Sequence, residues 1–402
     1  MAPNPKTMRT GLNSAQRREP AQGLMFFPHQ LGIALTLLLL AGCGEKAPPP
    51  PIYLGHIAPR TGSQRDVGLG AADAILLAVE TIRATEGQVL DRPIAVVHPD
   101  SQGNPDAVES EAVRLATVGH VVGLIGGYEP ESAERLARIA QQYKLPVITP
   151  TWLPTQTLGH FTFSLGAPPA DRGKLLADFA VKTLAAKRLA ILTDSRRADA
   201  IAATTAFRGA AGKQVVAFAE EFASDDRLKE LIQQALAVEP DLLLFAGTSA
   251  DLDRVRRQLR QAKLPEQTPL LFAGADTPEL SALVDAAADP FIYWTTLFVA
   301  DGSQPPAQEF ARRYEQRFGQ PPLPASAQSH DAVLLFAEAI RRAKSGQGDK
   351  VREELAGFQD FQGLTGPIRW EKNQAVGRPL HVVHRKDRQQ AVVRGAGDGD
   401  KR

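Results

Sequence analysis

Acidic and aromatic side chains stand in short turn sequences that are rich in glycine, proline and threonine. Tyr128, Glu129 and Glu131 share one such turn, and Trp152 and Asp276 lie in two others. A carboxylate accepts hydrogen bonds from an ammonium or amide group, and an aromatic face attracts a cation. If both glutamates face inward, these five side chains favour a neutral amide or a cationic ligand. If the glutamates face outward, they complement the N-terminus of their own helix instead.

Catalytic and metal-binding patterns are missing from the sequence, so we expect neither an enzyme nor a bound cofactor or metal. The eight histidines are scattered without the spacing of a zinc-binding helix, and there is no nucleophile elbow or phosphate-binding loop. The segment 68–73 resembles part of a dinucleotide-binding fingerprint but lacks its third glycine, which favours a role in close helix packing. His330 and Asp331 have no identifiable partner nucleophile, so we expect them to cap a helix or line a cleft.

The elements that must position these turns alternate regularly from Ile52 onward. Short β-rich apolar runs are followed by turns and then by helices with apolar residues three and four apart. The predicted strands are 52–58, 94–97, 121–125, 146–149, 189–193, 215–222, 242–246, 270–273 and 292–298. Such alternation predicts an α/β fold with parallel sheets that carry helices on both faces.

The length of the chain predicts two domains, which we call lobes, because roughly 350 residues are more than one hydrophobic core usually organises. Glycine and proline interrupt the pattern at 166–169. Two helices, at 308–318 and 326–343, and a β-rich tail come last, which indicates that the lobes are interleaved in sequence. We assign 52–166 and 299–357 to lobe 1, 167–298 and 358–394 to lobe 2, and 395–402 to a disordered polar tail.

The turns that follow the predicted strands are the candidate binding positions. In an open α/β sheet, ligands bind outside the carboxyl ends of the strands, where helix N-termini converge. The turns are 59–63, 126–132, 149–152, 246–249 and 274–277. The candidate ligand-binding residues in these turns are Thr61, Tyr128, Glu129, Glu131, Thr151, Trp152, Thr248 and Asp276.

Cys43 is the only cysteine, and it follows an apolar run, 31–40, that is too short to cross a bilayer as a helix. The run suits a signal peptide, which we assign to residues 1–42. The string Leu40-Ala41-Gly42-Cys43 resembles the lipobox of bacterial lipoproteins, in which the thiol is acylated. Residues 43–51 are then a stiff, proline-rich linker between a membrane anchor and a folded part on the periplasmic or cell-surface face. The alternative is a buried structural cysteine.

Charge excludes one class of partner. The formal net charge is only +1, which gives no electrostatic basis for binding nucleic acid. Basic and acidic residues alternate along 131–138 and 251–260, as is typical of solvated helix faces. We therefore expect no nucleic acid among its partners.

Several short segments resemble those of a known protein family in their order and spacing along the chain. They are Thr61-Gly62, 68–72, 121–127, 133–150, 330–333 and 361–368. Together they resemble the type I periplasmic binding proteins of the branched-chain amino acid and amide class, which serve ABC importers. The resemblance runs from Ile52 to near Val393. It implies two Rossmann-like lobes with parallel sheets, joined by three crossovers, that close on a small ligand, and an ABC permease that recognises the closed form.

The resemblance also implies a division of the ligand site. In amino-acid-binding members, donors on lobe 1 hold the ligand carboxylate, and an acidic residue on lobe 2 holds its ammonium. Asp276 matches that acidic residue. Pro130 has no N–H to donate, and Leu153 stands where a hydroxyl is expected, although Thr151 lies nearby. The carboxylate-facing half therefore departs from the family pattern.

Two functions stay open at this point. One is an extracytoplasmic solute-binding lipoprotein that captures a small polar amino-acid-like or amide ligand and delivers it to an ABC importer. The other is a sensory or scaffold lipoprotein of the same fold that regulates a receptor or a cell-wall enzyme. Neighbouring genes for two permeases and two ATPases would favour the first.

Overall fold

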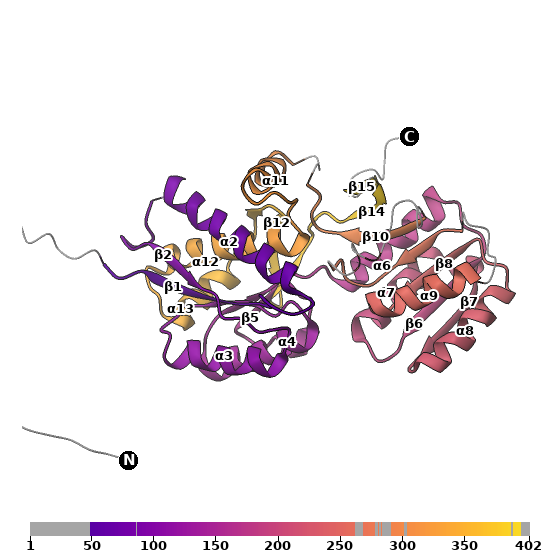
Figure 1. Cartoon of the computed structure of the whole chain (residues 1–402), viewed down its shortest axis with the longest axis horizontal. Coiled ribbons are helices and arrows are strands. Elements are labelled where there is room, and N and C mark those ends of the chain that lie inside the picture. The colour runs from indigo at the N-terminus through magenta and orange to yellow at the C-terminus, as the bar shows by residue number, and fades with distance from the viewer. Residues whose placement is uncertain are drawn as a thin grey trace, which may run out of the picture. The chain divides into compact units, whose positions relative to one another are not determined.

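Two β-sheets, each with helices on both faces, make up the computed structural model of the protein (Figure 1). The structure describes residues 49–85, 87–261, 268–277, 280, 283, 291–300, 304–386 and 389–394. The predicted signal peptide, Cys43 and the tail 395–402 lie outside these residues. Within them, no helix combines the length and apolar character that crossing a bilayer requires.

The first sheet has eight strands. Their spatial order is β11 (Phe361–Gly363), β12 (Gly366–Glu371), β13 (Gln374–Val376), β5 (Thr162–Ser164), β4 (Val147–Thr149), β3 (Leu124–Gly126), β1 (Ile52–Ile57) and β2 (Ile94–Val97). The five strands β1 to β5 run parallel to one another, as the alternation of strands and helices predicts. The hairpin strands β11, β12 and β13 pair antiparallel and extend the sheet beyond β5.

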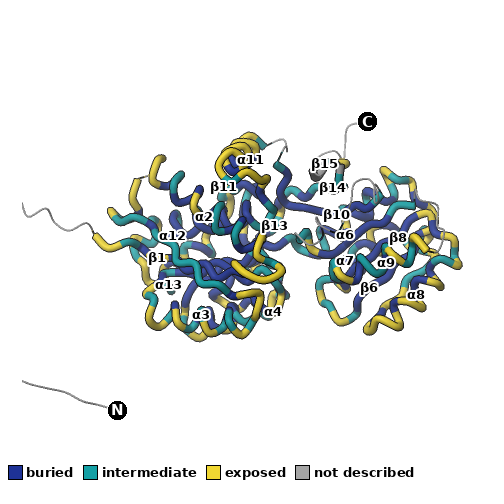
Figure 2. Tube along the Cα trace, in the orientation of Figure 1, coloured by how far each residue is buried: buried dark blue, intermediate teal, exposed yellow. Residues whose placement is uncertain are grey.

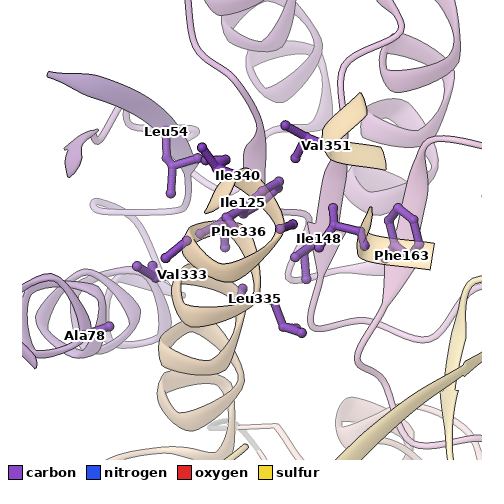
Figure 3. Packing of buried hydrophobic residues seen from close by; sticks show 14 of the residues in the cluster. Leu54, Ala78, Ile125, Ile148, Phe163, Val333, Leu335, Phe336, Ile340 and Val351 are labelled. Carbon is purple, nitrogen blue, oxygen red and sulfur yellow. The ribbon is translucent and has the colours of Figure 1, made fainter. Parts of the chain in front are cut away.

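Helices bury both faces of the first sheet. One face packs against α2 (Arg65–Thr85), α12 (Pro324–Ala343) and α13 (Gly348–Ala356), and the other against α3 (Pro105–Thr117) and α4 (Pro130–Tyr143). Figure 3 shows the first of these cores, in which Ile125 and Ile148 of the strands face Phe336 of α12. Each such fully buried side chain contributes about 1.5–3 kcal/mol to stability. The short helix α5 (Thr155–Leu158) precedes β5, and α11 (Pro305–Phe318) packs on α2.

The second sheet has seven strands. Their spatial order is β15 (Gln389–Arg394), β14 (His381–Lys386), β10 (Ile292–Thr296), β9 (Leu270–Phe272), β8 (Leu242–Ala246), β6 (Leu189–Asp194) and β7 (Val216–Phe222). Strands β6 to β10 run parallel, whereas β14 and β15 are antiparallel. One face packs against α8 (Asp225–Ala237) and α9 (Ser249–Gln261). The other face packs against α6 (Pro169–Asp178), which continues as a π-helical turn over Phe179–Thr183, and α7 (Ala198–Ala211).

Burial follows these layers in both sheets. The central strands are buried, while the outer faces of α3, α4 and α8 are exposed (Figure 2). This is the pattern of helices that cover a sheet with one apolar stripe and turn their charged stripe to solvent. It confirms the predicted α/β fold with helices on both faces of each sheet.

The chain passes between the two sheets three times, after β5, after β10 and after β13. In the last crossover, the Nη2 atom of Arg378 donates to the carbonyl oxygens of Leu165, at 2.6 Å, and Gly166, at 3.2 Å. Burial lowers the pKa of Arg378 to about 10, and the charge of nearby Asp331 opposes that shift. The three crossovers implied by the resemblance are therefore present, and a buried guanidinium ties two of them together.

The strand pairing adds to the predicted arrangement and differs from it in one place. All nine predicted strands are present, and β5 is an additional strand that the apolar pattern does not reveal. We assigned the whole of 358–394 to lobe 2, but β11, β12 and β13 pair within the first sheet. Gln374 of β13 pairs with Ser164 of β5, and this long-range contact decides which sheet the hairpin joins. Only β14 and β15 join the second sheet.

Candidate functional site

The first turn of the first sheet is held by one carboxylate. Asp100 accepts hydrogen bonds from Thr61 Oγ1 at 2.7 Å, from Arg60 N at 2.8 Å and from Gln102 N at 2.8 Å. Desolvation raises the pKa of Asp100, but these hydrogen bonds prevail and hold it below its usual value. The hydroxyl of Thr61, a predicted ligand-binding group, is therefore already engaged by the protein.

Two glycines let the next turn approach the first strand. Gly126 and Gly127 have φ values of 155° and 74°, and a Cβ on Gly126 would lie 2.4 Å from the carbonyl oxygen of Ile57. Only glycine adopts this path without strain. The turn thereby brings α4 to the carboxyl edge of the sheet, where Glu129 is its N-cap residue.

The two glutamates of this turn point in different directions. Glu131 is exposed and pairs with Arg135, 3.3 Å away on the same helix, which is the outward orientation. Glu129 accepts a hydrogen bond from Gln64 Nε2 at 2.5 Å. Both Gln64 and Glu129 line a small hollow of about 10 Å³, which has room for about one water molecule, together with Tyr128 and Ser132. Glu129 is thus the glutamate at the carboxyl edge of the sheet.

Tyr128 belongs to a buried chain of hydrogen bonds. Its hydroxyl lies 2.7 Å from His56 Nε2 and 2.8 Å from Ser329 Oγ, and His56 Nδ1 lies 2.8 Å from His98 Nδ1. Ser329 donates its single proton to the carbonyl of Ala325, so it must accept from Tyr128. Tyr128 in turn accepts from His56 Nε2–H, and His56 Nδ1 accepts from His98 Nδ1–H. In this series of hydrogen bonds, each residue therefore donates to the next, from His98, directly after β2, to Ser329 in α12.

Burial keeps this chain neutral. It lowers the pKa of His56 well below its ordinary value, and the charges of His98 and Arg60 add to the shift. Burial, followed by the charge of Arg60, lowers the pKa of His98 to about 4. Burial also raises the pKa of the Tyr128 hydroxyl. The chain therefore fixes the position of Tyr128 and leaves its hydroxyl no free proton for a ligand.

The turn after β4 offers the first sheet's remaining candidates. Thr151 and Trp152 are half-buried, and Thr151 N donates to Thr149 Oγ1 at 3.2 Å. Leu153 is buried in a small apolar cluster beneath α4. Leu153, which stands where the family pattern has a hydroxyl, thus makes an apolar packing contact instead. Of the two candidates in this turn, Thr151 is the one with a side-chain hydroxyl.

On the second sheet, the two candidate side chains also have protein partners. Thr248 donates to Asp251 Oδ2 at 2.8 Å and accepts from Asp251 N at 3.1 Å, which caps the start of α9. Asp276, which is half-buried after β9, accepts from Trp294 Nε1 at 3.1 Å. A carboxylate has two oxygens, and each of them can accept more than one hydrogen bond.

Charged residues that the sequence did not single out gather at the same edge of the second sheet. Arg196 binds Asp194 in a two-pronged contact, with N–O distances of 2.8 and 2.9 Å. Beside it, Arg172 and Arg197 share the carboxylate of Asp199. Burial lowers the pKa of Arg172, and Asp199 opposes that shift. Each of these arginines therefore has a carboxylate partner at the carboxyl edge of this sheet.

Helix α12 connects the edge of the first sheet to the crossovers. Gln328 donates to Pro150 O at 3.0 Å and to Leu165 O at 2.6 Å. Asp331 accepts from Leu364 N, Thr365 N and Thr365 Oγ1, and so holds the turn between β11 and β12. His330 packs edge-on against a phenyl ring of α11 at 5.0 Å. Both residues expected to cap or line a cleft therefore serve packing and turn geometry.

The structure thus places every candidate residue at the carboxyl edge of its own sheet. Three candidate hydroxyls already form hydrogen bonds within the protein, namely those of Thr61, Tyr128 and Thr248. Glu131 faces outward. The sequence held a signal for the His56–His98 pair, because His56 lies inside one predicted strand and His98 directly follows its parallel neighbour. Arg172 and Arg197 gave no comparable signal, because an arginine near a helix start is usually solvated.

The arrangement suits the binding of a small polar solute. In the part of the chain that the structure describes, no three histidine, cysteine or acidic side chains are grouped to hold a metal ion. The polar and aromatic groups at these edges are the Thr151 hydroxyl, the Trp152 ring, the carboxylates of Glu129 and Asp276, and the arginines of the second sheet. They can donate and accept hydrogen bonds to a small polar solute.

Comparisons with known proteins agree with this architecture. A family model described as a periplasmic binding protein matches residues 51–390. Among solved structures, the branched-chain amino acid transporter substrate binding protein LivJ from Streptococcus pneumoniae, in complex with isoleucine, is similar with a TM-score of 0.73 and 20% identity. That match covers 86% of this chain and 98% of the other.

Two further structures show the range of similar proteins. A leucine binding protein LivK from Thermotoga maritima has a TM-score of 0.72 and 22% identity over 86% of this chain and 99% of its own. A solute binding protein of an ABC transporter from Rhodopseudomonas palustris, in complex with 3,4-dihydroxybenzoic acid, has a TM-score of 0.68 and 20% identity. It covers 85% of this chain and 95% of its own.

Proposed function

This chain belongs to the periplasmic binding protein family, and we propose that it captures a small polar, amino-acid-like or amide solute between its two lobes and delivers it to an ABC importer. The observation that supports this most directly is the placement of the candidate residues at the carboxyl edges of both sheets. Contacts with both lobes favour a closed form, since a ligand shifts an equilibrium by its differential affinity for the two states. An ABC permease then recognises that form.

Three side chains are our proposed ligand contacts. Thr151 and Trp152 serve on lobe 1, and Asp276 serves on lobe 2, where its carboxylate accepts from an ammonium or amide group. Thr61, Tyr128 and Thr248 position the turns through their bonds to the protein. The similar LivJ structure holds isoleucine and the Rhodopseudomonas palustris structure holds 3,4-dihydroxybenzoic acid, so the panel of test solutes must include both classes.

The test is calorimetric titration of the purified protein with amino acids, amides, polyamines and hydroxybenzoates. We expect one class to bind and Asp276→Asn to weaken the binding of an ammonium or amide ligand by about tenfold, the loss of one hydrogen bond to a charged group. Asp349→Asn, an exposed change on α13, is the matched control and should bind as the wild type does. Absence of binding by any solute would contradict solute capture and favour a sensory or scaffold role.

We also propose that the chain is a lipoprotein on the periplasmic or cell-surface face. The support is the lipobox-like string that ends at Cys43 and the proline-rich segment that follows it. An acyl chain on Cys43 would hold the protein at the membrane close to its permease. Cys43→Ala should move the protein from the membrane fraction to the supernatant of lysed cells, and mass spectrometry of the N-terminal peptide should show acylation only in the wild type. Unchanged fractionation would contradict the anchor.

A further inference from the structure

The start of α12 carries polar side chains in a buried position. Gln328, Ser329 and Asp331 are all buried, and burial of a polar group is unfavourable unless hydrogen bonds compensate it. The three residues bind four separate segments of the chain, which include two of the candidate turns and the first crossover. About one turn of helix thus connects the carboxyl edge of the first sheet to the segments that join the two sheets.

Gln328 joins two of these segments through a single amide group. Its Nε2 atom donates to the carbonyl oxygen of Pro150, at 3.0 Å, and to that of Leu165, at 2.6 Å. Both neighbours are acceptors, so the amide NH2 group must face them, and its two hydrogens are both used. Pro150 begins the turn that holds the proposed contacts Thr151 and Trp152, which we call the ligand turn, and Leu165 is the first residue after β5. One side chain therefore connects the ligand turn to the first crossover.

The first crossover is attached to the ligand turn at a second point. Ser164 Oγ donates to the carbonyl oxygen of Thr151 at 2.9 Å and accepts from Gly166 N at 3.2 Å. The two segments also pack without a gap, because a Cβ on Gly166 would lie 2.0 Å from the backbone nitrogen of Trp152. Closely packed groups transmit a displacement instead of absorbing it. A movement of the ligand turn therefore moves the first crossover.

The third crossover is bonded to the same carbonyl group. Arg378 Nη2 donates to the Leu165 oxygen at 2.6 Å, the distance at which Gln328 Nε2 also donates to it. A carbonyl oxygen has two lone pairs, so both are used here. Leu165 is fully buried, which strengthens these hydrogen bonds. The position of Leu165 relative to α12 therefore fixes two of the three crossovers.

We infer that Gln328 is a positioning residue that couples the ligand turn to the first crossover. This inference rests on the proposed function and adds a regulatory step to it: a ligand that displaces the turn also displaces the amide of Gln328, which passes the displacement to Leu165. Because Leu165 also binds Arg378, the first and third crossovers respond together. Small shifts at a binding site are amplified in this way when packed elements have discrete arrangements. The lobes therefore close in response to a ligand that contacts this turn.

The competing interpretation is that Gln328 only stabilises the first lobe. Gln328→Met keeps the length of the side chain but removes both donors, so both interpretations expect a lower melting temperature. They differ in the effect of a ligand on the first crossover, which only a coupling residue transmits. Gln374→Met is the matched control, because Gln374 of β13 is also buried in this lobe and its Nε2 atom has no hydrogen-bond partner among the described residues.

The experiment combines titration with amide hydrogen exchange on the full-length protein, purified in mild detergent. The probes are L-leucine, L-leucinamide, 4-hydroxybenzoate and spermidine, and the one that binds the wild type most tightly is used at saturation for hydrogen exchange. In the wild type, we expect it to slow exchange both in the ligand turn and in the first crossover, 164–167. Gln328→Met should bind that probe about tenfold more weakly, within the usual range of coupling between sites, and should lose the slowing in the crossover while keeping it in the turn. Gln374→Met should behave as the wild type does.

Each other outcome overturns a defined claim. Unchanged affinity of Gln328→Met, or slowed exchange in its crossover at saturation, overturns the coupling and leaves solute capture intact. Equal effects of Gln328→Met and Gln374→Met do the same. If Gln328→Met does not fold, Ser164→Ala removes the other hydrogen bond to the ligand turn, and wild-type affinity and crossover exchange in that variant overturn the coupling. Failure of all four probes to bind the wild type overturns the proposed function and the coupling together.

Discussion

The Nδ1 atoms of His56 and His98 lie 2.8 Å apart, and only one of them carries a proton. Protonation of the acceptor, His56 Nδ1, would bring two N–H groups face to face and break the contact. The hydrogen bond between His56 and Tyr128 would be lost as well, because His56 could no longer stay between its two partners. The position of the Tyr128 turn therefore depends on a neutral His56.

We predict that acid destabilises the folded state through this pair. Burial lowers the pKa of both imidazoles, that of His98 to about 4, whereas an unfolded histidine titrates near 6.5. Between those values the unfolded state binds more protons, so the free energy of unfolding falls as the pH falls. The expected slope is up to about 1.4 kcal/mol per pH unit for each histidine. Urea unfolding at several pH values from 7 to 4 measures it.

Two variants separate this effect from general acid denaturation. His98→Gln keeps a donor toward His56 but does not titrate, so it should remove about half of the slope between pH 6.5 and about 4. His160→Gln changes an exposed histidine and should leave the slope as it is. Identical slopes for the wild type and His98→Gln would show that the pair carries no such linkage.

Removing the Tyr128 hydroxyl should destabilise the first lobe. Tyr128→Phe leaves the buried His56 Nε2–H and the Ser329 hydroxyl without their shared partner. The expected loss is about 1–3 kcal/mol in the free energy of unfolding, as is usual for an unsatisfied buried donor. Tyr143→Phe, on the half-buried end of α4, should change it by less than about 0.5 kcal/mol. Equal losses in the two variants would contradict the hydrogen-bond chain.

Asp331 should be the most sensitive carboxylate of the first lobe. Its oxygens accept three hydrogen bonds from the turn at Leu364 and Thr365, and its charge faces the buried Arg378. Asp331→Asn keeps the shape but removes the charge and replaces one acceptor oxygen with a donor. We expect a loss of about 1–3 kcal/mol, because the amide nitrogen that replaces one carboxylate oxygen would leave a buried donor of the turn without its acceptor. Thermal unfolding of Asp331→Asn beside Asp360→Asn, an exposed carboxylate before β11, provides the comparison; similar melting temperatures would contradict this role.

Local patterns predicted the layers of this fold well, because each central strand is a run of apolar residues flanked by turn residues. They missed β5, whose three residues Thr162–Ser164 include two hydroxyls and are buried only because β4 and β13 lie on either side. The hairpin at 361–376 was placed in the wrong sheet for the same reason. Its partner, Ser164, is remote in sequence, and no local preference encodes that pairing.

The candidate site shows the same division between local and long-range information. Strand-to-helix order identified the turns, since carboxyl ends of parallel strands share one edge. Which hydroxyl is free for a ligand depends on distant partners, such as Asp100 for Thr61 and Ser329 for Tyr128. The buried arginine at 172 was equally hidden, because its burial results from the close packing of α6 on α7.

Two glycine-to-alanine changes should have opposite effects on the stability of the protein. A Cβ on Gly166, in the first crossover, would lie 2.0 Å from the backbone nitrogen of Trp152, so either the crossover or the candidate turn must move. We expect Gly166→Ala to cost about 1–3 kcal/mol in stability and to weaken ligand binding, since Trp152 is a proposed contact. Gly209→Ala, in α7 with open space around it, should instead stabilise the protein by about 0.5–1 kcal/mol and leave binding unchanged. Thermal unfolding and titration of both variants measure these effects, and a Gly166→Ala protein with wild-type stability and affinity would show that the crossover and the turn move freely past each other.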